Sequence, residues 1–211
     1  MSCSAIFKCT TAKELFELWQ KAHKNEQGSE TVPKMNGDAL IAKHNFIADG
    51  CLDLKKETAK YLYILKESNQ EKQLDCGDCI HFGALEWRRS NETSAKRQNT
   101  KIMKLFSILD DKEISSSDLA VININKRGGY NRCDEAALLS YGREYKDFIK
   151  QQIEIIAPSK VICANTVFDI LADIYGACDI VNTFEYNEIK FYKWYHPGSR
   201  KPYSKFLQRF K

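Results

Sequence analysis

The chain has 211 residues, of which 43% are hydrophobic and 28% charged, and its formal net charge is +4. This composition excludes a disordered or collagen-like chain, and the length suits a single domain with its own core. No stretch approaches the roughly 18 consecutive apolar residues of a membrane span, and the N-terminus becomes acidic and amphipathic too early for a secretory signal. We therefore expect a cytoplasmic, monomeric, single-domain protein over residues 1–211, with no membrane partner.

The first 58 residues are predicted to form a helical N-terminal extension. Thr11 and Glu14 have the spacing of a capping box, and Leu15 and Leu18 follow at helical intervals. The elements expected up to the middle of the chain are a polar loop over 25–38, a buried strand over 61–66, a long loop over 68–81 and a basic amphipathic helix over 94–109.

The second half of the chain alternates apolar strand-like runs with helical periodicity. Strands are predicted over 119–125, 160–164, 178–183 and 189–195, with a turn after 125, a long helix over 138–156 that ends before Pro158, and a second helix over 166–176. Strands that alternate with helices indicate an α/β fold: a three-layer sandwich with a mainly parallel central sheet flanked by helices.

The eight cysteines do not form an obvious disulfide framework. Cys51, Cys163 and Cys178 lie beside apolar residues, as buried reduced thiols do. Cys76 and Cys79 form a lone CxxC pair, whereas a structural zinc site takes four ligands and no second pair is evident. An unliganded pair is favoured over zinc, and no metal or cofactor is expected.

Positive charge is concentrated in two segments. Residues 190–211 hold seven Lys or Arg and no Asp or Glu, and a second basic stretch runs from Arg88 and Arg89 to Lys104. Such surfaces are selected by polyanionic partners, although solvated helix faces have the same composition.

Ligands of parallel α/β sheets bind outside the carboxyl ends of the strands. Here the loops that follow three predicted strands are polar: KESNQ at 66–70, NKRGGYNR at 125–132 and YHPGSRK at 195–201. One site assembled from all three loops is the simplest interpretation.

These residues resemble the uracil-DNA glycosylase superfamily. The similarity is strongest in VININKRGGYNR (121–132) and in the long helix that leads through a Pro-Ser-Lys-Val-Ile run to the next strand. YILKESN (63–69) stands in the place of the first family motif and YHPGSR (195–200) in that of the last, so the resemblance covers roughly residues 60–205. It implies a glycosylase-like fold and a monofunctional enzyme that flips a base out of single- or double-stranded DNA and hydrolyses its N-glycosidic bond.

The resemblance also implies roles for individual residues. Glu67 first and Asn69 second would hold the attacking water, and His196 would hydrogen-bond the departing base. Asn123 would read the polar edge of the base, Phe82 would stack on it, and Ser68 stands where the uracil-specific family has an Asp. The residues expected at the DNA backbone are Lys66, Lys126, Arg127, Ser199, Arg200 and Lys201.

The sequence departs from the family pattern in ways that leave the substrate open. Lys66 replaces a Gly of the first motif, and Arg127 stands where an iron–sulfur ligand would fall, so no cluster is expected. The base is uracil, another deaminated base or a modified base. The alternative is a catalytically silent DNA-binding or interaction protein on the same fold. Taken singly, each residue also has a plain structural interpretation, in which Asn123 caps a strand, His196 lies on the surface before Pro197 or Phe82 belongs to the core.

Overall fold

The computed structural model describes residues 8–26, 31–33, 40–42, 45–69, 80–129, 134–178 and 180–210. The helices are α1 (Ala12–Asn25), α2 (Gly83–Arg89), α3 (Thr93–Asp110), α4 (Glu135–Glu144), α5 (Lys146–Ile156), α6 (Thr166–Tyr175) and α7 (Ser204–Gln208), with a 3-10 turn at Ser116–Asp118. The strands are β1 (Thr31–Pro33), β2 (Leu40–Ala42), β3 (Phe46–Ile47), β4 (Gly50–Cys51), β5 (Tyr61–Asn69), β6 (Ile80–His81), β7 (Leu119–Gly129), β8 (Lys160–Ala164), β9 (Thr183–Tyr186) and β10 (Ile189–Trp194).

A mixed sheet of six strands, in the order β4-β7-β5-β8-β10-β9, forms the centre of the protein. The four inner strands are parallel to their neighbours, and the short edge strands β4 and β9 are antiparallel. β5 pairs with β7 from Tyr61 opposite Leu119 to Asn69 opposite Gly129. The α/β class and the largely parallel sheet predicted from the sequence are confirmed.

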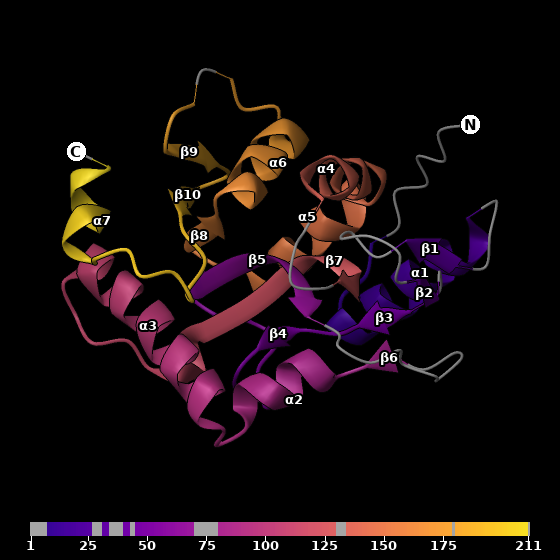
Figure 1. Ribbon diagram of the computed structural model, residues 1–211, viewed down its shortest axis with the longest axis horizontal. Helices are drawn as coiled ribbons and strands as arrows, with labels where there is room; N and C mark the ends of the chain where they lie inside the picture. The colour runs from indigo at the N-terminus through magenta and orange to yellow at the C-terminus, as the bar shows by residue number, and fades with distance from the viewer. Residues whose placement is uncertain are drawn as a thin grey trace.

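Helices cover both faces of this sheet (Figure 1). Because side chains of a strand alternate between faces, Leu62 and Ile64 of β5 pack in one hydrophobic cluster with α1, α4, α5 and α6. Tyr61 and Tyr63 belong to a second cluster with α3 and with Phe206 of α7. The sheet thus lies between two helical layers, each with its own apolar contact surface.

The long helix predicted over 138–156 is two helices. α4 ends at Glu144 and α5 begins at Lys146, with Tyr145 between them at φ −102° and ψ 20°. The apolar spacing continues across Tyr145, whose side chain is buried, so the sequence pattern does not mark the break. The predicted strand over 178–183 is also displaced, because β9 spans 183–186 and pairs there with β10.

The prediction of a helical extension over residues 1–58 is wrong for most of the described part. Only α1 is helical; Phe16 and Trp19 of α1 are buried in the main hydrophobic cluster together with Phe46 and Ala48. β4 hydrogen-bonds to β7 as an edge strand of the central sheet. The segment is therefore part of the core, because its apolar side chains complete one face of the sheet.

Two of the three predicted buried thiols are buried: Cys51 and Cys163 are free and enclosed, whereas Cys178 is free and exposed. Cys76 and Cys79 lie outside the described residues. Within the described part of the chain, no helix is both long and apolar enough to cross a membrane.

A glycine sets the distance between α4 and α6. A Cβ atom on Gly142 would lie 2.6 Å from Cγ2 of Ile170, closer than real carbon contacts allow. Gly142→Val should therefore lower the free energy of unfolding by about 1–3 kcal/mol, the usual cost of overpacking. Chemical denaturation measures this loss, and Ser140→Val, at an exposed position of the same helix, is the matched control. Equal stability of the two variants would contradict this packing argument.

Candidate functional site at the carboxyl ends of the strands

The carboxyl ends of the parallel strands are held together by contacts between segments distant in sequence. The hydroxyl of Tyr63 in β5 donates to the carbonyl of Tyr195, just after β10. The backbone N–H of Asn165, at the end of β8, donates to the carbonyl of Trp194 at 2.6 Å. Asn165 has a positive φ of 28°, which is costly for a non-glycine residue. The segment after β10 therefore packs against β5 and β8, whereas residues 70–79 and 130–133, which follow β5 and β7, lie outside the described part of the structure.

Asn123 of β7 has a defined set of contacts. It is buried, and its Nδ2 donates to Ser68 Oγ at 3.1 Å and to Asp49 Oδ2 at 3.2 Å. Its Oδ1 is buried and has no hydrogen-bond partner among the described residues. A buried acceptor without a donor costs free energy, and a ligand that presents an N–H would satisfy it.

Lys126 is completely buried, so its predicted role as a DNA-backbone contact is wrong. Its Nζ donates to Asp49 Oδ1 at 2.5 Å and to the carbonyl of Asn123 at 2.7 Å, and lies 5.3 Å from the centre of the Trp19 ring. β7 continues to Gly129, so Lys126 stays in phase with Ile122 and Ile124 and faces the helices rather than solvent. Burial lowers the pKa of Lys126, and the Asp49 carboxylate opposes that shift.

Arg127, a second predicted phosphate contact, also points inward. Its guanidinium is paired with Glu26, donates to Tyr145 Oη at 3.2 Å and lies over the rings of Tyr141 and Tyr145. With only 8% of the residue exposed, Arg127 joins α1 to the α4–α5 junction instead of offering a charge to DNA.

The predicted water-holding loop after β5 is part of the strand, which extends to Asn69. Glu67 is partly buried and accepts a hydrogen bond from Asn125 Nδ2 at 3.2 Å, and the two residues are opposite each other in the β5–β7 register. Lys66 is partly exposed and forms an ion pair with Glu135 at 2.9 Å. The side chain of Asn69 lies outside the described part of the structure.

His196 is exposed at the start of a tight turn. Its Nδ1 accepts a hydrogen bond from the backbone N–H of Gly198 at 2.9 Å, and the N–H of Ser199 donates to the carbonyl of His196 at 2.8 Å. A neutral ring that accepts through Nδ1 carries its proton on Nε2, which is therefore its hydrogen-bond donor. Lys101 of α3 donates to the carbonyl of Pro197 at 3.1 Å and fixes the turn against the helix.

Arg88 is a site residue that sequence reasoning assigned only to a basic stretch. It is buried, and its guanidinium donates to Asn99 Oδ1 at 3.1 Å. Burial lowers its pKa to about 10, so it remains a cation at neutral pH, and its charge interacts with both Asp49 and His196. Arg88 thus electrostatically connects the Asn123 network to the His196 turn.

Phe82, the predicted stacking residue, is 47% exposed directly before α2. Its carbonyl accepts from the N–H groups of Leu85 and Glu86, which fixes the backbone at the start of the helix. An exposed aromatic ring of this kind is available to stack on a planar partner, and the alternative that Phe82 belongs to the core is wrong.

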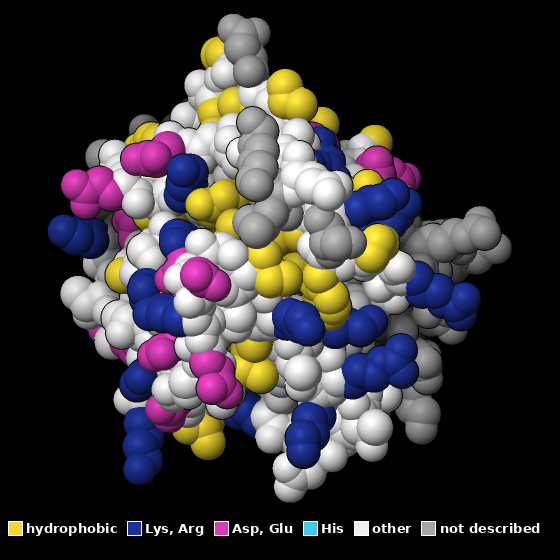
Figure 2. Space-filling model, turned by 90° about the vertical axis from the view of Figure 1, so that its left-hand side faces the viewer, with side chains coloured by type: hydrophobic (Ala, Val, Ile, Leu, Met, Phe, Trp, Pro, Cys, Tyr) yellow, Lys and Arg dark blue, Asp and Glu magenta, His cyan; other side chains and the backbone are white. Residues whose placement is uncertain are grey.

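A basic surface extends from the site over α3 and the segment that leads into α7. Arg200 and Lys201 are exposed there, and Ser199 beside them is partly exposed. The other exposed cations of this basic surface are Lys96, Arg97, Lys104 and Lys205. Figure 2 shows Lys and Arg side chains gathered at the lower right of this side of the protein, with most Asp and Glu side chains farther left. Arg89, from the same predicted stretch, instead donates to the carbonyl of Cys51.

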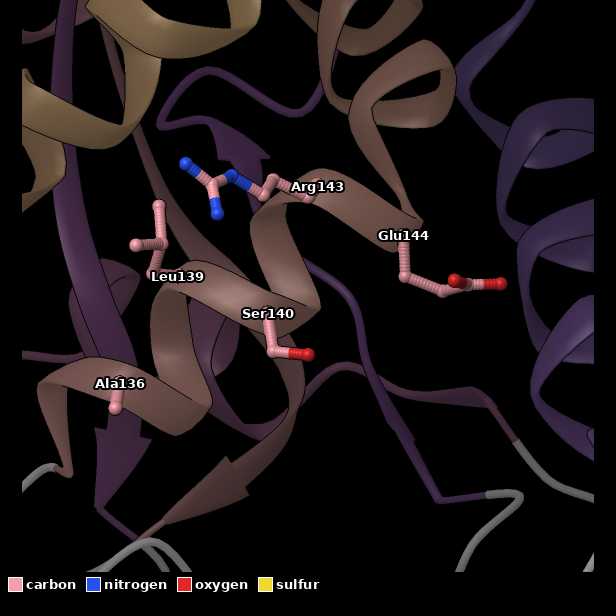
Figure 3. A pocket seen from close by; sticks show the side chains of 5 residues that line it. All are labelled: Ala136, Leu139, Ser140, Arg143 and Glu144. Atoms are coloured by element: carbon pink, nitrogen blue, oxygen red, sulfur yellow. The ribbon is translucent and has the colours of Figure 1, made fainter.

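A depression of about 350 Å³ lies on α4, and none of the predicted site residues lines it. Its lining residues, Ala136, Leu139, Ser140, Arg143 and Glu144, all project from this one helix (Figure 3). Arg143 is already paired with Asp173 at 2.8 Å. It is a shallow surface feature and does not contribute to the candidate site.

No protein-family model matches the chain, and no curated protein shows significant sequence similarity to it. The site itself offers a buried amide, a carboxylate hydrogen-bonded to a second amide, an imidazole N–H donor and surrounding cations.

The environment of His196 predicts its titration. Partial desolvation, then the charges of Arg88, Lys66 and Lys101, lower the pKa of His196 below its ordinary value of about 6.5. The ring should therefore be neutral at pH 7 and gain a proton only as the pH falls below that of an unperturbed histidine. Observing the His196 Cε1–H resonance by NMR across pH 4–8 measures the midpoint, and a midpoint at or above 6.5 would contradict the geometry.

Proposed function

We propose that the protein is a monofunctional DNA glycosylase, with a fold like that of the uracil-DNA glycosylase superfamily, which excises a uracil-like, deaminated or modified base. The observation that carries the proposal is the buried Asn123 amide of β7, whose Oδ1 has no donor among the described residues. Exposed Phe82 and the basic surface provide the other two requirements, a stacking ring and a phosphate-binding face.

The chemistry assigns a separate task to each loop. Water adds to the sugar C1′, the C1′–N bond breaks with its electron pair going to the base, and the proton lost by the water balances the one the base gains. Negative charge accumulates on the base as it leaves, where the Nε2–H of a neutral His196 is a suitable donor. Glu67, held by Asn125, is placed to orient the water or to stabilise positive charge on the sugar.

The nearby cations favour the same reaction. Arg88, Lys66 and Lys101 surround His196 closely enough to lower its pKa, so they also stabilise an anion bound to it. Lys126 and Arg127 are excluded from DNA contact by burial, which leaves Ser199, Arg200, Lys201 and the α3 cations for the phosphates.

Base release from oligonucleotides tests the proposal. Single- and double-stranded oligonucleotides with candidate bases are incubated with the protein and treated with alkali, and strand scission reports excision. Asn123→Ala, His196→Ala and Glu67→Gln should each reduce the single-turnover rate on the best base by about 10²–10³-fold, as the loss of one transition-state interaction does.

The matched control is Glu188→Gln, in the β9–β10 turn at the amino ends of the parallel strands. This variant should release the base at the native rate. Scission at native rates in all three site variants would remove the catalytic assignment. Binding to DNA without scission across the whole panel would favour a silent DNA-binding protein.

The basic surface predicts a strong dependence of DNA affinity on salt. Arg200→Glu combined with Lys201→Glu should weaken binding to all sequences alike and reduce the slope of log affinity against log salt by about one per lost phosphate contact. Fluorescence anisotropy at several salt concentrations measures both effects. The same charge change on α1, Lys13→Glu with Lys21→Glu, is the control, and an equal effect of the two pairs would rule out a localised DNA surface.

A further inference from the structure

Asp49 is a buried carboxylate that accepts hydrogen bonds from three different residues. Its Oδ2 accepts from the backbone N–H of Asn123 at 2.7 Å and from Asn123 Nδ2 at 3.2 Å. Its Oδ1 accepts from Lys126 Nζ at 2.5 Å and from Gln152 Nε2 at 3.0 Å. β4 begins one residue later, at Gly50, and pairs with β7 only at Val121 and Ala120. The backbone N–H of Asn123 lies beyond this pairing and binds Asp49 instead.

The carboxylate determines which way the Asn123 amide points. A carboxylate only accepts hydrogen bonds, so the amide must turn its Nδ2 toward Asp49, and Ser68 Oγ accepts from the same nitrogen. In the flipped orientation, Oδ1 would face the Asp49 oxygens, which is repulsive in a buried site. Asn123 therefore keeps Oδ1, its acceptor, for any bound molecule.

We infer that Asp49 is a positioning residue that makes Asn123 select bases with an N–H at the edge it reads. The inference rests on the proposed function and gives it a substrate class. Deamination converts the acceptor N3 of cytosine into the N3–H of uracil, and the acceptor N1 of adenine into the N1–H of hypoxanthine. The fixed Oδ1 of Asn123 thus accepts a hydrogen bond from the deaminated base. The parent base would present its own acceptor nitrogen to Oδ1, and two acceptors repel. Thymine and guanine carry the same N–H, so their rejection depends on pocket shape.

The ion pair with Lys126 is what keeps this arrangement in place. Lys126 has no exposed surface, and its ammonium binds both Asp49 and the carbonyl of Asn123. Asp49 has only 3% of its side chain exposed. The ammonium is the counter-charge of the buried carboxylate, and a carboxylate accepts from Asn123 but cannot donate to it.

The test is a specificity ratio in a variant that removes both charges together. Asp49→Asn combined with Lys126→Met removes both members of the ion pair together and lets the Asn123 amide adopt either orientation, while the buried Arg88 keeps its hydrogen bond to Asn99. In single-turnover assays on matched oligonucleotides, the ratio of uracil to cytosine release should fall at least tenfold relative to the wild type. A purely structural defect would lower both rates and leave the ratio unchanged.

Gln152→Met is the matched control. Gln152 is equally buried and also donates to Asp49, but its loss leaves both Asn123 bonds to the carboxylate intact, so the ratio should stay at the wild-type value. In parallel, NMR of the Asn123 Nδ2 protons should show slow solvent exchange in the wild type and in Gln152→Met, and faster exchange in the double variant.

The outcomes separate this inference from the proposed function. If the wild type releases uracil and the double variant keeps the wild-type ratio, positioning by Asp49 is overturned while the glycosylase proposal stands. Rapid exchange of the Asn123 amide protons in the wild type would also overturn the positioning. If the wild type releases no base from the panel, the glycosylase proposal itself fails, and the selection rule fails with it.

Discussion

The ion pair between Asp49 and Lys126 is the interaction on which the candidate site depends. Both side chains are almost completely buried, and removal of one partner from such a pair costs about 3–5 kcal/mol because the other charge is left without compensation. The pair joins the segment before β4 to β7, and through Gln152 and Trp19 it contacts α5 and α1. The position of Asn123 at the sheet edge is thus tied to the core rather than to a surface loop.

The two halves of the site, around Asn123 and around His196, offer opposite hydrogen-bonding groups. Around Asn123, every donor of the amide nitrogen is used by Asp49 and Ser68, and the group that remains is an acceptor. Around His196, the Gly198 N–H occupies the ring acceptor and the remaining group is a donor, with Arg88 and Lys66 nearby. An acceptor on one side and a donor among cations on the other are the groups that the proposed glycosylase would use on a base that offers an N–H and develops negative charge.

The same network explains why the N-terminal part of the chain belongs to the domain. Asp49 comes from this part, and so do Trp19, which lies against Lys126, and Glu26, which pairs with Arg127. Lys126 and Arg127, two of the cations that the resemblance assigns to DNA, are paired with Asp49 and Glu26 and turned inward. Exposed cations remain outside the network, on α3 and in the segment after His196, which is where we propose that DNA binds.

The sequence by itself determined the elements whose signal is local. The apolar runs at 61–66, 119–125, 160–164 and 189–195 are strands, and the capping box opens α1, because alternation and caps depend only on neighbouring residues. It also predicted that the segment after β10 lies near β5, because parallel strands end on the same side of the sheet.

Only the tertiary structure decided which charges are buried and what orients Asn123. Lys126 and its partner Asp49 are 77 residues apart, and nothing in the sequence around either marks the pairing. The break at Tyr145 is hidden for a related reason, since the same apolar spacing serves one helix or two. Local patterns report which face of an element is apolar, whereas the burial of a charge depends on a partner that only the fold brings near.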